Sequence, residues 1–417
     1  MKYIYYLLFI FTFQKYLMID AREPLAELWD IQDNDILEYL ARESHLTMVD
    51  RTLKRFLDEL NFAETYINVA NNSIIVYSVN MSKIPEIISK PEIEQYKQFL
   101  DFRKVNNSLA SLKSSFNELA ILAKENKPTS IMFGILPKLN KIVVVVDHIR
   151  RRRREFQILR AFIFSAERHG AEIFYVDSSS GKLHAKRGLC CGKLTTEVLS
   201  GDGIYNEFYR SLCSAGFWAR RKDKSQTLLI TAGHCDLENH PSESKMKFVT
   251  WNTTRPEIIG ELVYSSEAPH DFALIDIKKM SNRLCPLTNI KNNLDSQLTI
   301  NDDVLPASSY GTHLCRSGVY SPVSCGYVEG FNMIHVSKSK IVKTDSIFVS
   351  IMISESGDSG GPSFSFSSLT SVTLKGILWG GSSEGRSPLG LYSLILPLEI
   401  ILNNTNLELI TSRIVPR

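Results

Sequence analysis

The run Gly-Asp-Ser-Gly-Gly-Pro at residues 357–362 constrains this chain more than any other part of its sequence. It places a serine hydroxyl in a tight turn between glycines, which is the backbone shape that an acyl-transfer nucleophile needs. Small neighbours let a substrate carbonyl approach Ser359, and they leave the N–H groups of Gly357 and Ser359 free to bind a developing oxyanion. Because a serine is inert at neutral pH without a base, the rest of the chain must supply one.

Two segments upstream offer a base and a carboxylate. His234 lies in the run Thr-Ala-Gly-His-Cys, directly after the apolar residues 228–230, which predict a buried strand end. Asp271 precedes the alternating residues 272–275, which predict a half-buried strand. Asp276 lies in the same stretch and is an alternative carboxylate. We prefer Asp271 because it stands at the head of the apolar run.

These motifs, in the chain order His234, Asp271, Ser359, resemble those of the chymotrypsin-like serine peptidases. The resemblance implies that His234 takes the serine proton and later returns it to the leaving amine. It implies that Asp271 fixes the imidazole tautomer and stabilises the imidazolium. The implied fold is an all-β catalytic domain of two six-stranded antiparallel β-barrels with a C-terminal helix. The helical pattern at 398–402 is the expected position of that helix.

Further segments resemble the streptogrisin and alpha-lytic protease branch of this family. Residues 201–205 and 211–217 are similar to the start of its catalytic domain, and the likeness extends over about residues 195–412. Two cysteine pairs, Cys213–Cys235 and Cys315–Cys325, match disulfides of the family, which fits an oxidising compartment. The pairing of the three remaining cysteines is open: Cys190, Cys191 and Cys285.

Asp358 stands beside the nucleophile and should be buried, and an unpaired buried carboxylate is costly. Animal relatives pair it with a new α-amino group made by activation cleavage. The bacterial branch uses the arginine after the cysteine, which here is Arg316. The resemblance therefore implies an Arg316–Asp358 ion pair and an oxyanion turn that needs no free N-terminus.

The substrate pocket is expected between the segment before Ser359 and the strand at 376–381. Its candidate residues are Ile353, Trp379, Gly380 and Gly381. Trypsin-like enzymes carry an aspartate six residues before the nucleophile, where this chain has Ile353, so an apolar or aromatic substrate residue is expected rather than Lys or Arg. Trp379 also stands where the family usually has a serine that helps to hold the triad carboxylate.

The length allows several domains, and three segments are predicted. Residues 1–21 carry Lys2 followed by an apolar run at 3–13 and predict a signal peptide, hence secretion. Residues 22–194 carry helical patterns and two hairpin patterns, at 66–79 and 133–146. These hairpin-and-helix subdomains resemble the propeptide of the alpha-lytic branch. Residues 195–417, rich in short strands and turns, predict the catalytic domain.

The sequence therefore predicts a secreted serine endopeptidase made as a precursor. Its propeptide is expected to assist folding of the catalytic domain and to inhibit its activity. Expected partners are protein or peptide substrates and the chain's own propeptide, and a monomer is expected. A net charge of +3 gives no reason for a nucleic-acid partner, and no histidine spacing indicates a metal or other cofactor. The alternatives are a catalytically impaired homologue that acts as a binding module, and an N-terminal half that is an unrelated interaction domain.

Overall fold

The computed structural model describes residues 22–147, 153–176, 196–208, 210–236, 247–251, 253, 255–292, 296–321, 323–382 and 389–411. The predicted signal peptide at 1–21, the predicted propeptide boundary at 194–195, and Cys190 and Cys191 lie outside these residues. Among the described helices, none is both long and apolar enough to cross a membrane.

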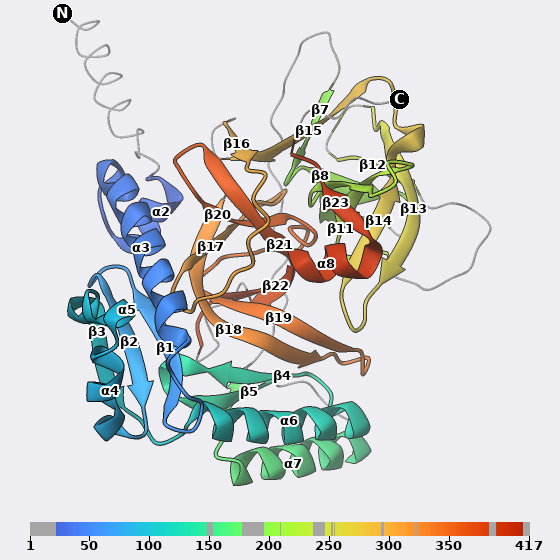
Figure 1. The fold of residues 1–417 in the computed structure, drawn as a ribbon. Coiled ribbons are helices and arrows are strands. Elements are labelled where there is room, and N and C mark those ends of the chain that lie inside the picture. Colours follow the sequence, from blue (N-terminus) through green and yellow to red (C-terminus); the bar gives the residue numbers. More distant parts are fainter. Residues whose placement is uncertain are drawn as a thin grey trace, which may run out of the picture.

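The N-terminal half, residues 22–176, combines helices with two groups of strands (Figure 1). Its helices are α2 (Pro24–Trp29), α3 (Ile36–Lys54), α4 (Ile84–Ile88), α5 (Pro91–Glu94), α6 (Leu109–Asn126) and α7 (Arg153–Arg168). Its strands are β1 (Phe62–Asn68), β2 (Ser73–Ser78), β3 (Leu100–Lys104), β4 (Ile131–Leu136), β5 (Lys141–Asp147) and β6 (Glu172–Val176).

The two strand groups repeat one local design. An antiparallel hairpin, β1–β2 or β4–β5, is followed by helical structure and then by a strand that pairs parallel to the second hairpin strand. The first hairpin turns at Asn72, whose φ of 50° is a left-handed conformation that asparagine tolerates. Both predicted hairpins are therefore present, and each is longer by a few residues than its sequence pattern.

The C-terminal half is mostly β. Its strands are β7 (Thr196–Ser200), β8 (Gly203–Asn206), β9 (Ser211–Ser214), β10 (Trp218–Arg221), β11 (Thr227–Thr231), β12 (Lys247–Thr250), β13 (Ile258–Ser266), β14 (Phe272–Asp276), β15 (Leu284–Lys291), β16 (Gln297–Ile300), β17 (His313–Arg316), β18 (Ser324–Val336), β19 (Val342–Ser350), β20 (Pro362–Phe366), β21 (Ser371–Ser382), β22 (Tyr392–Pro397) and β23 (Leu407–Leu409). The helix α8 (Leu398–Thr405) lies at the predicted C-terminal position.

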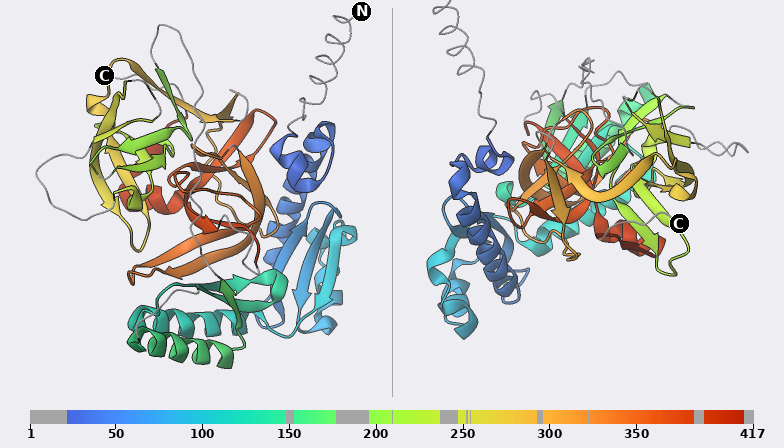
Figure 2. Two further views of the ribbon diagram at one scale, coloured as in Figure 1. Left: turned by 180° about the vertical axis from the view of Figure 1, so that it is seen from behind. Right: turned by 90° about the horizontal axis from the view of Figure 1, so that it is seen from above.

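These strands form two sheets. An eight-stranded sheet has the order β23-β10-β11-β14-β13-β12-β8-β9. A twelve-stranded sheet contains β15 to β22 together with β7, and it also includes β4, β5 and β6 of the N-terminal half because β4 pairs with β18. The views in Figure 2 place the N-terminal elements beside the orange and red strands of the twelve-stranded sheet, away from the green and yellow strands of the other.

The sheets differ from the six-stranded antiparallel sets expected from the sequence. β4 to β6 extend one sheet, and two strand pairs, β7–β15 and β16–β21, are parallel. A tight hairpin forces antiparallel pairing, but strands joined by long connections can pair in either direction. The connections from β7 to β15 and from β16 to β21 each contain several other strands, so turn geometry does not fix the direction.

Buried polar contacts hold α3 against the C-terminal half. Glu43 accepts hydrogen bonds from the backbone N–H and the ring Nδ1 of His313 on β17, at 2.7 and 2.5 Å. About two turns further along α3, Asp50 accepts a bond of 2.6 Å from Ser309 Oγ. All four residues are buried. Because buried carboxylates require directional partners, these contacts fix where α3 lies.

Candidate active site

His234 is positioned by the strand that precedes it. Residues 228–230 are completely buried in the eight-stranded sheet as part of β11, and the short helix η5 (Gly233–Cys235) follows. The disulfide Cys213–Cys235 ties the end of this segment to β9. The ring of His234 is half-buried, so one edge can face the protein while the other stays accessible.

Asp271 lies directly before β14, which pairs with β11 so that Ala273 faces Thr231. This register brings the carboxylate to His234: its Oδ2 is 2.9 Å from the ring Nδ1, and its Oδ1 accepts a 3.0 Å bond from the backbone N–H. Asp276, the alternative carboxylate, lies at the other end of β14 and caps the backbone N–H of Lys278. The structure therefore pairs His234 with Asp271.

Asp271 is only 1% exposed, and its surroundings favour the charged form. Burial raises the pKa of this carboxyl, but attraction to His234 and Lys343, with the hydrogen bonds from both, outweighs burial and lowers the pKa to about 2. Asp271 is therefore ionised at neutral pH. An ionised partner keeps the imidazole proton on Nδ1 and leaves Nε2 of His234 as a proton acceptor.

The turn that carries Ser359 depends on two glycines with left-handed backbone. Gly357 has a φ of 109° and Gly360 a φ of 88°, and a side chain at Gly360 would come within 2.1 Å of Thr231 Oγ1. Buried Ser214 fixes this turn: its N–H donates to Ser359 O at 2.8 Å, and its Oγ donates to Gly357 O at 2.9 Å. Ser214 O in turn accepts from Thr231 Oγ1, so the serine turn is held against the β11 strand end.

Within the described residues, the hydroxyl of Ser359 and the N–H groups of Gly357 and Ser359 have no hydrogen-bond partner. In particular, no bond joins Ser359 Oγ to His234 Nε2, although their backbone segments are in contact. Such bonds are often long without substrate and tighten when it binds. The two free N–H groups are the donors that the sequence assigns to the oxyanion.

Asp358 and Arg316 are both completely buried, and they form an ion pair with Oδ2 and Nη1 3.0 Å apart. Asp358 also accepts bonds from the backbone N–H groups of Tyr320, Ser321 and Glu355, at 2.9, 3.2 and 2.9 Å. The carboxylate beside the nucleophile is thus fully partnered without a free N-terminus. The second disulfide joins Cys315, the residue directly before this arginine, to Cys325.

The candidate pocket residues lie in different settings. Ile353 is exposed, and its carbonyl accepts a 2.7 Å bond from Arg316 Nε. A side chain at Gly380 would meet open space, whereas one at Gly381 would come within 2.6 Å of Tyr392 O. Trp379 is buried, and its indole Nε1 donates to Ser346 Oγ at 3.0 Å. The substrate pocket itself stays a prediction.

Lys343 on β19 is a further residue of the site that the sequence does not predict. Its Nζ contacts Asp271 Oδ2, the oxygen that also faces His234 Nδ1, and it lies 4.6 Å from the centre of the Trp379 ring. A lysine on a neighbouring strand therefore supports the buried carboxylate of Asp271. A lysine in a strand carries no signal of a partner 72 residues away in the sequence.

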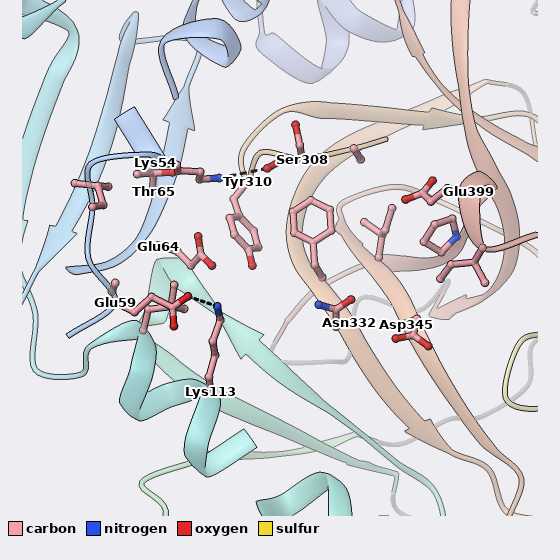
Figure 3. A pocket seen from close by; sticks show the side chains of 18 of the residues that line it. Lys54, Glu59, Glu64, Thr65, Lys113, Ser308, Tyr310, Asn332, Asp345 and Glu399 are labelled. Carbon is pink, nitrogen blue, oxygen red and sulfur yellow. Dashed lines mark hydrogen bonds and ion pairs between the residues drawn. The ribbon is translucent and has the colours of Figure 1, made fainter. Parts of the chain in front are cut away.

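A cavity of about 540 Å³ lies between the N-terminal half and the twelve-stranded sheet (Figure 3). Its labelled polar lining includes Lys54, Glu59, Glu64, Lys113, Tyr310, Asn332, Asp345 and Glu399. Burial raises the pKa of Glu64, and the attraction of Lys54 and Lys113 offsets only part of this. None of its lining residues belongs to the His234, Asp271 and Ser359 set, so this cavity is separate from the candidate catalytic groups.

Over the ranges that the structure covers, no group of three or more His, Cys, Asp or Glu side chains could hold a metal ion. Cys285 is the one free cysteine in these ranges and is half-buried. The described chemistry of the site thus consists of an imidazole, a carboxylate, a hydroxyl and two backbone donors.

No protein-family model matches this sequence, and no curated protein matches it. Among solved structures, Thermobifida fusca Protease A is 21% identical over 52% of this chain and 100% of its own, with a TM-score of 0.41. Cellulomonas bogoriensis chymotrypsin is 22% identical over 52% and 100%, with a TM-score of 0.39. A Nocardiopsis protease is 20% identical over 51% and 99%, also at 0.39. Similarity at this level does not carry chemistry, which has to come from this chain's own side chains.

Proposed function

We propose that this chain is a secreted serine endopeptidase that cleaves peptide bonds through an acyl-enzyme. The observation that carries the proposal is the pairing of His234 with ionised, buried Asp271, next to a rigid glycine turn that presents Ser359. The proposed catalytic domain is the two-barrel domain of residues 195–417, and we propose that the substrate binds beside Gly380.

In the proposed reaction, Ser359 Oγ attacks the scissile carbonyl carbon while its proton passes to His234 Nε2. The carbonyl oxygen becomes an oxyanion that the N–H groups of Gly357 and Ser359 bind. His234 then protonates the leaving amine, the C–N bond breaks and the acyl-enzyme remains. Water, deprotonated by the same nitrogen, hydrolyses the ester and restores Ser359. Asp271 stays ionised throughout and stabilises the imidazolium.

An activity-based probe tests this directly. A fluorophosphonate, which reacts with serines activated by a base, should label the purified protein at Ser359, as mapped by mass spectrometry. Ser356, three residues away and exposed, is the internal control and should stay unlabelled. If Ser359 carries no label, the competing proposal of a binding module is favoured.

The N-terminal half is proposed to be a propeptide that assists folding of the catalytic domain and inhibits its activity. Its support is the way β4 extends β18 and α3 covers β17, which adds ordered structure to the catalytic half. Mass spectrometry of the product secreted from the full-length chain should then find a mature form that begins close to residue 195. A product that keeps residues 22–176 would contradict the propeptide but not the endopeptidase.

A further inference from the structure

Lys343 places a positive charge directly behind the carboxylate of the candidate triad. The Lys343 and Asp271 side chains are 10% and 1% exposed. Both Lys343 Nζ and His234 Nδ1 address the same carboxylate oxygen, Oδ2. One carboxylate does not stabilise two cations independently, because the positive charge of each cation partly cancels the negative potential at the other. Lys343 and His234 therefore share one carboxylate oxygen.

The surroundings of Lys343 hold its ammonium in place. The Trp379 ring lies 4.6 Å away in a cation–π contact, and the indole is fixed by its bond to Ser346 Oγ. On the other side, Lys343 pairs in register with His335 on β18, and His335 pairs with Met132 on β4. The strand that carries Lys343 thus has little freedom to move the charge away from Asp271.

The other charged groups near Lys343 or His234 do not replace it. His335 is a further titratable group, paired in register with Lys343. Burial, with the repulsion of Lys343, lowers the pKa of His335 to about 4 against the attraction of Asp271, so this ring is neutral when His234 must act as a base. Its Nδ1 is buried and has no hydrogen-bond partner among the described residues. Asp345, on the same strand, is occupied by His270, with Oδ2 2.9 Å from Nε2. Asp236, two residues after His234, is half-buried, and burial raises its pKa.

We infer that Lys343 is a positioning residue that shares the Asp271 carboxylate with His234 and so extends the pH range in which His234 is a neutral base. This inference rests on the proposed function. Without the ammonium, the whole charge of Asp271 faces the ring and stabilises the imidazolium. The acidic limb of the rate profile should then move to higher pH, by about one pH unit for charges this close in a partly screened site.

The test compares full-length variants by the pH dependence of fluorophosphonate labelling and of the His234 ring resonances in isotope-labelled protein. Lys343→Gln, which removes the charge and keeps a donor, should shift both titrations upward by about one unit. Lys343→Arg keeps the positive charge and should therefore show the same pH dependence as wild type. Lys338→Gln is the matched control, because Lys338 is exposed on the hairpin between β18 and β19.

The outcomes separate the two proposals. If Lys343→Gln leaves the His234 titration unshifted while the protein is folded, the role of Lys343 is wrong whatever the labelling shows. If wild type is not labelled at all, the endopeptidase proposal fails, yet the ring resonances still report the coupling to Lys343. Should Lys343→Gln not fold, Lys343→Met provides the same removal of charge with an apolar chain that can pack on Trp379, and the same shift is required of it.

Discussion

Replacement of Ser359 by alanine should lower kcat/KM for a peptide amide by roughly 10⁴- to 10⁶-fold while the protein stays folded. The loss is large because no other described group can form the acyl-enzyme, and a small residual rate is expected from the oxyanion donors alone. Stability should change by less than about 0.5 kcal/mol, because the removed Oγ is half-buried and has no hydrogen bond within the described residues.

The matched control is Ser356→Ala, which removes a hydroxyl from the exposed end of the same segment and should leave kcat/KM unchanged. Rates are measured with an apolar peptide substrate, and folding with thermal unfolding of both variants. A Ser359→Ala protein that cleaves as fast as wild type would remove this serine from the mechanism. In that case another residue of the turn or a contaminating enzyme must be responsible.

The parts of the site that the sequence predicts are those set by local chemistry. A buried carboxylate next to a nucleophile needs a cation, and the family pattern supplies Arg316; the ion pair with Asp358 is present. Both cysteine pairs carried over from the family pattern form disulfides. The hairpins of the N-terminal half follow from alternating strands around a turn residue such as Asn72. Each of these depends on residues close in sequence or on a fixed motif.

The parts that the sequence does not predict are contacts between distant strands and helices. Lys343 reaches Asp271 across 72 residues, and Glu43 reaches His313 across 270. A strand alternates in the same way whichever partner covers its inner face, so periodicity cannot name the partner. For the same reason, the pairing of β4 with β18, which joins the N-terminal half to the twelve-stranded sheet, leaves no trace in either strand's pattern.

Replacement of Arg316 by methionine should destabilise the protein by about 3–5 kcal/mol and abolish activity. Methionine fills much of the volume but leaves Asp358 as a buried charge without a cation. The substitution also removes the Nε bond to Ile353 O, which joins the guanidinium to the segment before the serine turn. Arg316→Lys should recover little, because a single ammonium cannot bond Ile353 and Asp358 in the geometry of the planar guanidinium.

The cause of this loss can be isolated by adding Asp358→Asn to the Arg316→Met variant. Asparagine keeps the shape of the side chain and removes the unpaired charge, so the double variant should unfold at higher denaturant concentration than Arg316→Met alone. Asp358→Asn by itself should be destabilising, since it leaves Arg316 buried without its counter-ion. If the double variant is no more stable than Arg316→Met, the cost lies in lost packing and hydrogen bonds. If Arg316→Met instead unfolds at the same denaturant concentration as wild type, the turn beside Ser359 does not depend on this ion pair. In that case the hydrogen bonds from Tyr320, Ser321 and Glu355 alone hold the carboxylate.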